Sequence, residues 1–383
     1  MSEIKVNSIK GVGASAAAIT VNNTDGTCTA NITNNLSNRN VIINGAAQVN
    51  QRGNLTGQTS SVYSLDRFTT RIGAAGTWSI SQVTDSPDGF GTSIKYDCTT
   101  ATSTPSFLII QQRIEGQNLQ AFAKGTSAAK QFAVSFYVKT NKSGVYTVEL
   151  KDDDNDRVAA KTITVSDANW NRYTLIFPAD TTGAFDNDSN LSLNLSIWLA
   201  ASSTYTSGTF NSSSWSAKVN ANRISSSNVN LADSTSNEFL ITGIQLEVGS
   251  VATDFEHRSF GAELYLCQRY FETITFQHYS FHGFCNSNTS FDCPVFWTVE
   301  KRAAPTVTLP TTGTSDGQMT MANSSGYGST GGSIDAAASI TKNRCRVGGS
   351  GWTAGGGTAL ATGHSITLYG GGNGCTIKID AEL

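Results

Sequence analysis

The chain has 383 residues, a formal net charge of −3 and 14% charged residues. This length allows two or three domains of roughly 100–200 residues each. The near-neutral charge excludes electrostatic steering towards nucleic acid or a polybasic membrane contact, and no apolar run approaches the roughly 18 residues of a membrane span. Low charge, 36 glycines and 9% aromatic residues fit β-strands with polar outer faces and tight turns rather than disorder.

The first segment, residues 1–37, holds short alternating stretches around Ile4, Ile19 and Ile32, which glycine and asparagine pairs interrupt. Strands this short and sparse cannot bury a core by themselves. We therefore expect an assembly arm that pairs with copies of itself or docks onto a partner. A frayed terminus is the alternative.

Residues 38–258 predict a β-sandwich domain. Val41–Ile43 suggest the start of an apolar strand, and Asn44-Gly45 is a strong turn signal. Clear alternating stretches follow at 77–83, 132–138, 145–150, 170–177, 191–199 and 239–248. Because no long helix separates these stretches, their spacing favours an antiparallel sandwich.

After residue 258 the apolar period changes from two to that of a helix, and Ser259 is a suitable N-cap. We expect a linking helix at 259–271 whose apolar stripe packs about a symmetry axis between subunits. The stripe assigned to subunit association consists of Leu264, Cys267, Tyr270 and Phe271. Residues 272–383 then predict a small C-terminal β-sandwich domain with glycine-rich loops.

The seven cysteines are irregularly spaced and none forms a CxxC pair, which argues against a zinc ribbon or a thioredoxin-like motif. Isolated buried thiols are the favoured interpretation. A bridge between Cys285 and Cys293 stays open. We expect no cofactor.

One acidic loop is a candidate metal site. Asp152, Asp154 and Asp156 could supply oxygen ligands to calcium. The glycine and distal glutamate of an EF-hand loop are missing, so a solvated hairpin loop is the favoured interpretation.

Several aromatic and histidine side chains are candidates for contact with a glycan or receptor. Trp170 and Trp198 lie inside alternating strands, where packing is the stronger interpretation. The predicted contact residues are Trp215, Tyr279, His282, Tyr327 and Trp352.

Catalytic motifs are missing from the sequence. It contains no GxSxG elbow, no HExxH and no P-loop. Glycoside hydrolysis needs two facing carboxylates, and no convincing pair stands out. The sequence also lacks the fixed repeat period that would indicate a β-helix. We expect a protein that is not an enzyme, with a surface-polysaccharide depolymerase as the alternative.

Three segments resemble tail-fibre and related virion-appendage proteins of tailed bacteriophages, many of them marine. These are NRNVIINGAAQVNQRG at 38–53, YSLDRF at 63–68 and ITGIQLEVGSVATDFEHRSFGAELYLCQRYF at 241–271. The start MSEIKVNSI and the segment RAAPTVTL at 302–309 are similar to parts of such proteins. Residues 132–247 also resemble carbohydrate-binding-type jelly rolls, which implies that the domain at 38–258 is a jelly-roll β-sandwich.

The resemblance implies a homotrimeric structural component of a virion, on the tail or another appendage, that attaches to a host-surface glycan. The arm would bind other virion proteins. Because the start of the sequence lacks the apolar core of a signal peptide, we expect assembly in the host cytoplasm. The alternative is a capsid-decoration or tail-scaffold protein that binds only other virion proteins.

Overall fold

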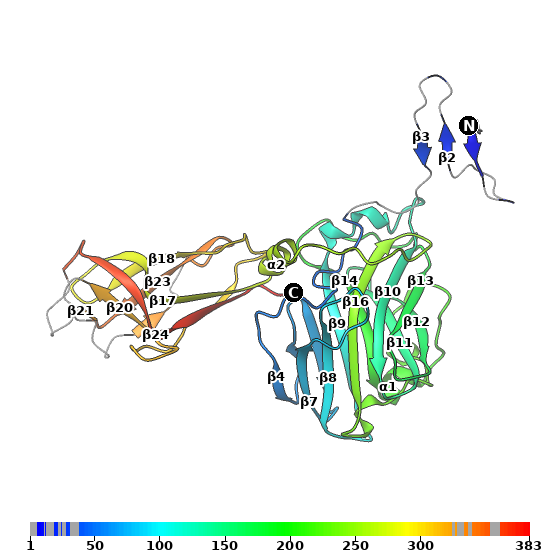
Figure 1. Ribbon diagram of the computed structural model, residues 1–383, viewed down its shortest axis with the longest axis horizontal. Coiled ribbons are helices and arrows are strands. Elements are labelled where there is room, and N and C mark those ends of the chain that lie inside the picture. The colour runs from blue at the N-terminus through cyan, green and yellow to red at the C-terminus, as the bar shows by residue number, and fades with distance from the viewer. Residues whose placement is uncertain are drawn as a thin grey trace, which may run out of the picture.

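The computed structural model describes residues 6–10, 12, 19–21, 24, 28–30, 38–323, 326–327, 333–335, 339–352 and 361–383. Figure 1 shows a small N-terminal sheet, a large two-sheet unit, a linking helix and an elongated C-terminal β domain. This arrangement confirms the predicted all-β fold class. None of the described helices is long and apolar enough to cross a membrane.

The N-terminal arm is an antiparallel sheet of three short strands, in the order β1-β2-β3. They are β1 (Ser8–Ile9), β2 (Ile19–Val21) and β3 (Cys28–Ala30). In Figure 1 the arm stands apart from the rest of the molecule. Val6 and Ile9 are 46% and 55% exposed, so these apolar side chains are not covered by the chain itself.

The large unit contains two antiparallel sheets. The six-stranded sheet has the order β13-β10-β16-β8-β7-β4, and the seven-stranded sheet has the order β15-β12-β11-β14-β9-β6-β5. The chain passes repeatedly from one sheet to the other, as from β8 to β9 to β10 to β11. These crossings define a jelly roll.

The strands of the six-stranded sheet are β4 (Leu55–Gln58), β7 (Thr77–Val83), β8 (Ser93–Thr100), β10 (Phe132–Thr140), β13 (Asn171–Phe177) and β16 (Glu238–Val248). Those of the seven-stranded sheet are β5 (Val62–Tyr63), β6 (Phe68–Gly73), β9 (Phe107–Glu115), β11 (Gly144–Asp152), β12 (Arg157–Val165), β14 (Leu191–Ala201) and β15 (Ser216–Ala217). The short helices are η1 (Gly116–Asn118), η2 (Gln120–Phe122), α1 (Ser203–Thr206), η3 (Asn220–Asn222) and η4 (Leu231–Asp233).

The jelly-roll core lies between the two sheets and follows the alternation of the sequence. Every second residue of β14 is buried there, namely Leu193, Leu195, Ile197 and Leu199. On β10 the buried set is Phe132, Val134, Phe136 and Val138. Because successive side chains of a strand point to opposite faces, the residues between them lie on the outer faces.

The expected strand at Val41–Ile43 is not formed; this stretch is irregular. Its N–H groups find partners outside a ladder. The amide of Val41 donates to Leu246 O at 3.0 Å, and that of Ile43 donates to Gln112 Oε1 at 2.8 Å. Asn44 holds the predicted turn in the left-handed region, with φ 62°. A buried irregular segment is tolerated because its polar groups are satisfied.

Helix α2 (Phe260–Gln268) follows, and the predicted N-cap is confirmed because Ser259 Oγ accepts a hydrogen bond from Ala262 N. The expected subunit contact through its stripe is corrected. Cys267, Tyr270 and Phe271 are at most 3% exposed within one chain. Cys267 and Tyr270 pack with Ile43, Val49 and the half-buried Leu264, so the stripe joins the helix to its own jelly roll.

The C-terminal domain is one continuous sheet in the order β21-β20-β24-β17-β18-β23-β22, with β19 also paired to β24. Its strands are β17 (Phe271–Cys285), β18 (Phe291–Phe296), β19 (Thr306–Thr308), β20 (Met319–Asn323), β21 (Gly326–Tyr327), β22 (Ser333–Asp335), β23 (Arg344–Ser350) and β24 (Ser365–Asp380). It encloses its own core around Val295, Met321 and Leu368. Cys285 and Cys293 are both free and buried there, which answers the open question of a bridge.

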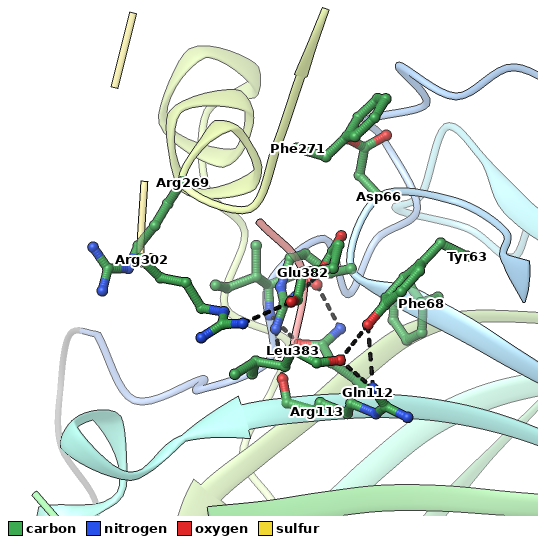
Figure 2. A network of polar contacts seen from close by, with 12 residues as sticks. Tyr63, Asp66, Phe68, Gln112, Arg113, Arg269, Phe271, Arg302, Glu382 and Leu383 are labelled. Atoms are coloured by element: carbon green, nitrogen blue, oxygen red, sulfur yellow. Dashed lines mark hydrogen bonds and ion pairs between the residues drawn. The ribbon is translucent and has the colours of Figure 1, made fainter. Parts of the chain in front are cut away.

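The joint between the jelly roll and the C-terminal domain is polar. The last residues return to it (Figure 1) and meet side chains of both units (Figure 2). The hydroxyl of Tyr63 donates to the main-chain oxygen of Leu383 at 2.5 Å, and Arg113 donates to the same oxygen. Arg302 Nη2 donates to Glu382 O at 2.7 Å.

A buried arginine lies at the centre of the joint. The Arg67 side chain is 1% exposed and pairs with Glu382, whose side chain is 3% exposed. The guanidinium of Arg67 lies 3.4 Å from the ring centroid of Tyr270. Burial acts to lower the pKa of Arg67, but Glu382 together with the neighbouring Tyr270, Tyr63 and Cys267 outweighs it, and the pKa is raised. The raised pKa keeps Arg67 charged within the buried joint.

A second ion pair joins the end of β9 to the residue that follows α2. Arg269 Nε and Nη2 donate to the two oxygens of Glu115 at 2.9 and 2.8 Å. Burial acts to raise the pKa of Glu115, but Arg269, Tyr270 and the charge of Arg67 together outweigh it, and the pKa is lowered. The pair fixes the helix against the jelly roll in a bidentate geometry.

Candidate functional site

The candidate site is a cleft on the outer face of the seven-stranded sheet. Along β9, Leu108 and Ile110 enter the core, so Ile109, Gln111 and Arg113 lie on the opposite face. These outward residues line a hollow of about 320 Å³. Its full lining is Arg71, Phe107, Ile109, Gln111, Arg113, Lys151, Asp153, Leu191, Asn194, Trp198, Tyr205, Lys218, Asn220 and Arg223.

Strand register sets the floor of the cleft in rows across the sheet. Arg71 on β6 lies opposite Ile109 on β9, which lies opposite Trp198 on β14. Two rows further along the same face, Arg113 lies opposite Asn194, and Asn194 lies opposite Lys151. Directly opposite residues have Cβ atoms about 4.5–5.5 Å apart, so each row presents neighbouring side chains.

The walls come from the segment between β14 and η4. Tyr205 on α1 stands over the floor, with its ring centroid 5.0 Å from that of Trp198 and 6.2 Å from that of Phe107. The amide of Gly208 donates to Ala221 O, which ties α1 to η3. The half-buried ring of Tyr205 is thereby fixed beside the hollow.

A buried ion pair supports the wall. Arg223 Nε and Nη2 donate to the two oxygens of Glu149 at 2.7 Å each, and the guanidinium lies 5.1 Å from the Trp198 ring centroid. Burial acts to lower the pKa of Arg223, and the hydrogen bonds and charge of Glu149 raise it more. The Glu149 carboxylate also accepts a hydrogen bond from Trp198 Nε1 at 3.3 Å, so Arg223 and Trp198 both hold it in place.

Two amide groups in the cleft have oxygens without a partner in the described part of the chain. They are Gln111 Oε1 and Asn194 Oδ1. The amide nitrogen of Gln111 donates to Ser196 Oγ at 3.1 Å, and that of Asn194 donates to Asp153. An unsatisfied buried acceptor costs about 1–3 kcal/mol, and both oxygens are buried beneath the surface of the floor.

Two of the predicted glycan contacts are wrong because the side chains are buried. Trp215 is 7% exposed, packs on Phe132 and donates its Nε1 hydrogen to Pro178 O at 2.8 Å. Trp352 is 0% exposed and packs edge-on against Phe291. Both rings contribute to the cores of their domains.

The other predicted contacts lie away from the cleft, in the C-terminal domain. Tyr279 is 59% exposed and stands edge-on to Tyr369, at 5.5 Å between centroids. His282 is exposed, with Nδ1 3.3 Å from Thr367 Oγ1. The side chain of Tyr327 lies outside the described residues. Within the described part of the chain neither Tyr279 nor His282 lines the cleft, and both stay predictions.

The three carboxylates proposed for calcium do not converge. Asp152 is fully buried and pairs with Lys124 Nζ at 2.5 Å. Asp154 accepts a hydrogen bond from Asp186 N at 3.0 Å, and Asp156 pairs with Lys218. Across the described residues no three His, Cys, Asp or Glu side chains group to hold a metal. The solvated-loop interpretation is the better one for Asp154 and Asp156, and Asp152 is structural.

Sequence reasoning missed the cleft, although part of its signal was present. The alternation of β9 and β14 shows which residues face outward, and several of these are large or polar. The missing information was the wall, because the serine-rich segment that carries Tyr205 and Arg223 predicts only a loop. Nothing local in that segment indicates which sheet face it covers.

The fold therefore defines a jelly-roll protein with a lined cleft on one sheet. No protein-family model and no curated protein matches the chain. Among solved structures, the chain is similar to a "Xylan-Binding Domain from CBM 22", with 13% identity over 52% of this chain and 98% of that one and a TM-score of 0.29. It is also similar to the family 11 carbohydrate-binding module of a cellulosomal cellulase of Clostridium thermocellum, with 13% identity over 54% and 98% and a TM-score of 0.27. A family 16 carbohydrate-binding module matches with 10% identity over 44% and 84% and a TM-score of 0.25. At these TM-scores the likeness adds nothing to the sheet order, which defines the jelly roll by itself.

Proposed function

We propose that the jelly roll binds a glycan in the cleft, and that the protein is a trimeric structural component of a virion that attaches to a host surface. The observation that carries the binding function is the cleft itself. A fixed aromatic ring, Tyr205, stands beside amide and guanidinium groups in a hollow of about 320 Å³. Binding sites are typically concave and of about 300–1,000 Å³, with a few convergent polar groups.

The chemistry of the lining suits a sugar. A sugar ring has an apolar face, which an aromatic side chain can cover, and hydroxyls that both donate and accept hydrogen bonds. Tyr205 supplies the ring. Gln111 and Asn194 place amide groups in the lining. The site on the jelly roll thus replaces the expected site in the C-terminal domain as the main candidate.

Binding without hydrolysis is the proposed outcome, because the carboxylates of the cleft are engaged. Asp153 pairs with Lys151, and Glu149 is held bidentately by Arg223. Glycoside hydrolysis needs one carboxyl group as a proton donor and another as nucleophile or base. Incubation of the chain with a bound polysaccharide should release no reducing ends. A rise in reducing ends would favour the depolymerase alternative.

The test of the binding site is a glycan array with the full chain and the variant Tyr205→Ala. We expect binding to fall by about tenfold or more, as for the removal of a central aromatic contact residue. Tyr279→Ala is the matched control, since it removes an exposed tyrosine from the C-terminal domain. Loss of binding in the control alone would place the glycan there and contradict the proposed site. No binding to any glycan would favour a capsid-decoration or tail-scaffold protein.

The virion function and the trimer rest on the resemblance of the sequence and on the arm. The arm has short strands and exposed apolar residues, among them Val6 and Ile9, and stands apart from the jelly roll (Figure 1). The stripe of α2 packs within one chain and is not free for a subunit contact. The helix still exposes two aromatic side chains, Phe260 and Tyr265. Light scattering of the full chain should give three times the monomer mass. A clean monomer at micromolar concentration would contradict the trimer, and removal of residues 1–37 should abolish incorporation into particles.

A further inference from the structure

The charge of the cleft differs from that of the whole chain. The chain carries a net charge of −3, yet the lining contains five cationic side chains and one carboxylate. The cations are Arg71, Arg113, Lys151, Lys218 and Arg223, and the carboxylate is Asp153. A concave site lined by one sign of charge concentrates ligands of the opposite sign.

Four of these cations already have partners. Lys151 pairs with Asp153, and Lys218 pairs with Asp156. Arg223 pairs with Glu149. Arg113 donates to the main-chain oxygen of Leu383 and to the hydroxyl of Tyr63. These four are fixed by the fold and leave little capacity for a ligand.

Arg71 is the exception. Its side chain makes no hydrogen bond and no ion pair within the described part of the chain, and its nearest aromatic contact is the Phe107 ring, 5.9 Å from Cζ to the centroid. It is half-buried and lines both this cleft and the adjoining hollow beside Tyr63. Burial lowers the pKa of Arg71, and the positive charge of Arg113 lowers it further. A half-buried guanidinium next to like charge is costly without an anion.

We propose that the cleft selects an acidic glycan and that the anionic group of the sugar binds Arg71. This inference rests on the proposed glycan site and names its ligand class. The planar guanidinium offers paired donors that match the oxygens of a carboxylate or a sulfate ester. The acidic group sits on Arg71 while a ring of the same glycan lies against Tyr205, which lines the same hollow, so the site recognises an acidic sugar rather than a free anion.

The test compares each acidic polysaccharide with its own neutral form. Polygalacturonate, alginate and hyaluronan are immobilised in native form and after chemical reduction of their carboxyl groups, and dextran sulfate is compared with dextran. The full chain should bind at least one native acidic polymer about tenfold or more better than its neutral form, as expected for a hydrogen-bonded charge. The carboxylate and sulfate arms distinguish the two sources of the negative charge.

The variant Arg71→Met should abolish this preference for the acidic forms. Its binding to the neutral forms should stay unchanged. Arg344→Met is the matched control, because Arg344 is an exposed arginine of the C-terminal domain that also lies 5.9 Å from an aromatic ring, that of Phe296. It removes the same charge from the chain and should leave the preference unchanged. Circular dichroism of both variants verifies that they fold.

The outcomes separate the two proposals. If neutral and acidic forms bind equally well, the acidic preference is wrong and the glycan site stands. If Arg71→Met and Arg344→Met weaken acidic binding equally, the binding is an unspecific effect of charge and the assignment to Arg71 fails. If no polysaccharide of either form binds, the glycan function itself fails, and this inference fails with it.

Discussion

The jelly-roll core and the joint to the C-terminal domain are both buried, and they are built from different chemistry. The core is a continuous set of aliphatic and aromatic side chains between two sheets. The joint buries the side chains of Arg67, Glu382 and Glu115, and Figure 2 shows Glu382 near Tyr63 and Arg302. Apolar contact is non-directional, whereas bidentate arginine–carboxylate contacts have a defined geometry. We infer that the core supplies stability and that the joint sets the orientation of the two domains.

The largest effect is expected from the core. Phe132→Ala removes a ring that is 0% exposed and stacks on Phe122 at 4.1 Å between centroids. The change should lower the free energy of unfolding by about 3–5 kcal/mol, since it leaves a cavity. Denaturant unfolding followed by circular dichroism measures it. The loss should be the same at low and high salt, and a strong salt dependence would contradict an apolar core.

The joint should give the next largest effect. Arg67→Met leaves Glu382 buried without its partner, and breaking a buried pair on one side costs about 3–5 kcal/mol. Because Arg52 Nη2 still lies 3.2 Å from Glu382 Oε1, we expect the lower end, about 3 kcal/mol. Unfolding should separate into two transitions as the domains uncouple. The double change Arg67→Met with Glu382→Met should cost less than the single one, and an equal or larger cost would show that the charges themselves are required.

Acid should weaken the joint before the core. The pKa of Glu115 is held below its ordinary value, because Arg269, Tyr270 and the charge of Arg67 together outweigh the effect of burial. Its contribution is therefore present above the unfolded pKa of about 4.3 and is lost as the pH falls through the lower folded value. Glu115→Gln should cost about 1–3 kcal/mol at pH 7 and remove this part of the pH dependence.

Asp66 acts in the opposite direction at the same joint. Burial raises its pKa, so its contribution to stability increases as the pH falls through the raised folded value. Unfolding between pH 7 and pH 3 of the natural chain and of Glu115→Gln isolates the contribution of Glu115. Parallel pH curves for the two proteins would contradict the assignment.

The smallest effect is expected from an exposed ion pair of the C-terminal domain. Arg346 lies 3.2 Å from Asp292, with side chains 43% and 16% exposed. Arg346→Met should change the free energy of unfolding by less than about 1 kcal/mol, because such pairs are screened by solvent. Thermal unfolding of this variant and of Arg67→Met measures how much more a buried ion pair contributes to stability than an exposed one. Similar shifts for both would contradict the distinction between the joint and the surface.

Part of the fold could be predicted from residues close together in the sequence. The strict alternation at 191–199 predicts the strand β14 and its buried face. Ser259 and the change of period predict the start of α2. The same local signal failed at Val41–Ile43, where apolar residues predict a strand. There Asn40, Gln112 and Leu246 provide the hydrogen-bond partners, and two of these lie far away in the chain.

By itself the sequence determined the fold class, the order of the domains and the inward face of each long strand, because these follow from the period of apolar residues along a short stretch. The tertiary structure alone decided which side chains were left for function. It buried Trp215, Trp352 and the stripe of α2. It also brought Arg71 and Tyr205 to one cleft. Contacts between residues more than a hundred positions apart depend on strand order and loop path, which no local pattern records.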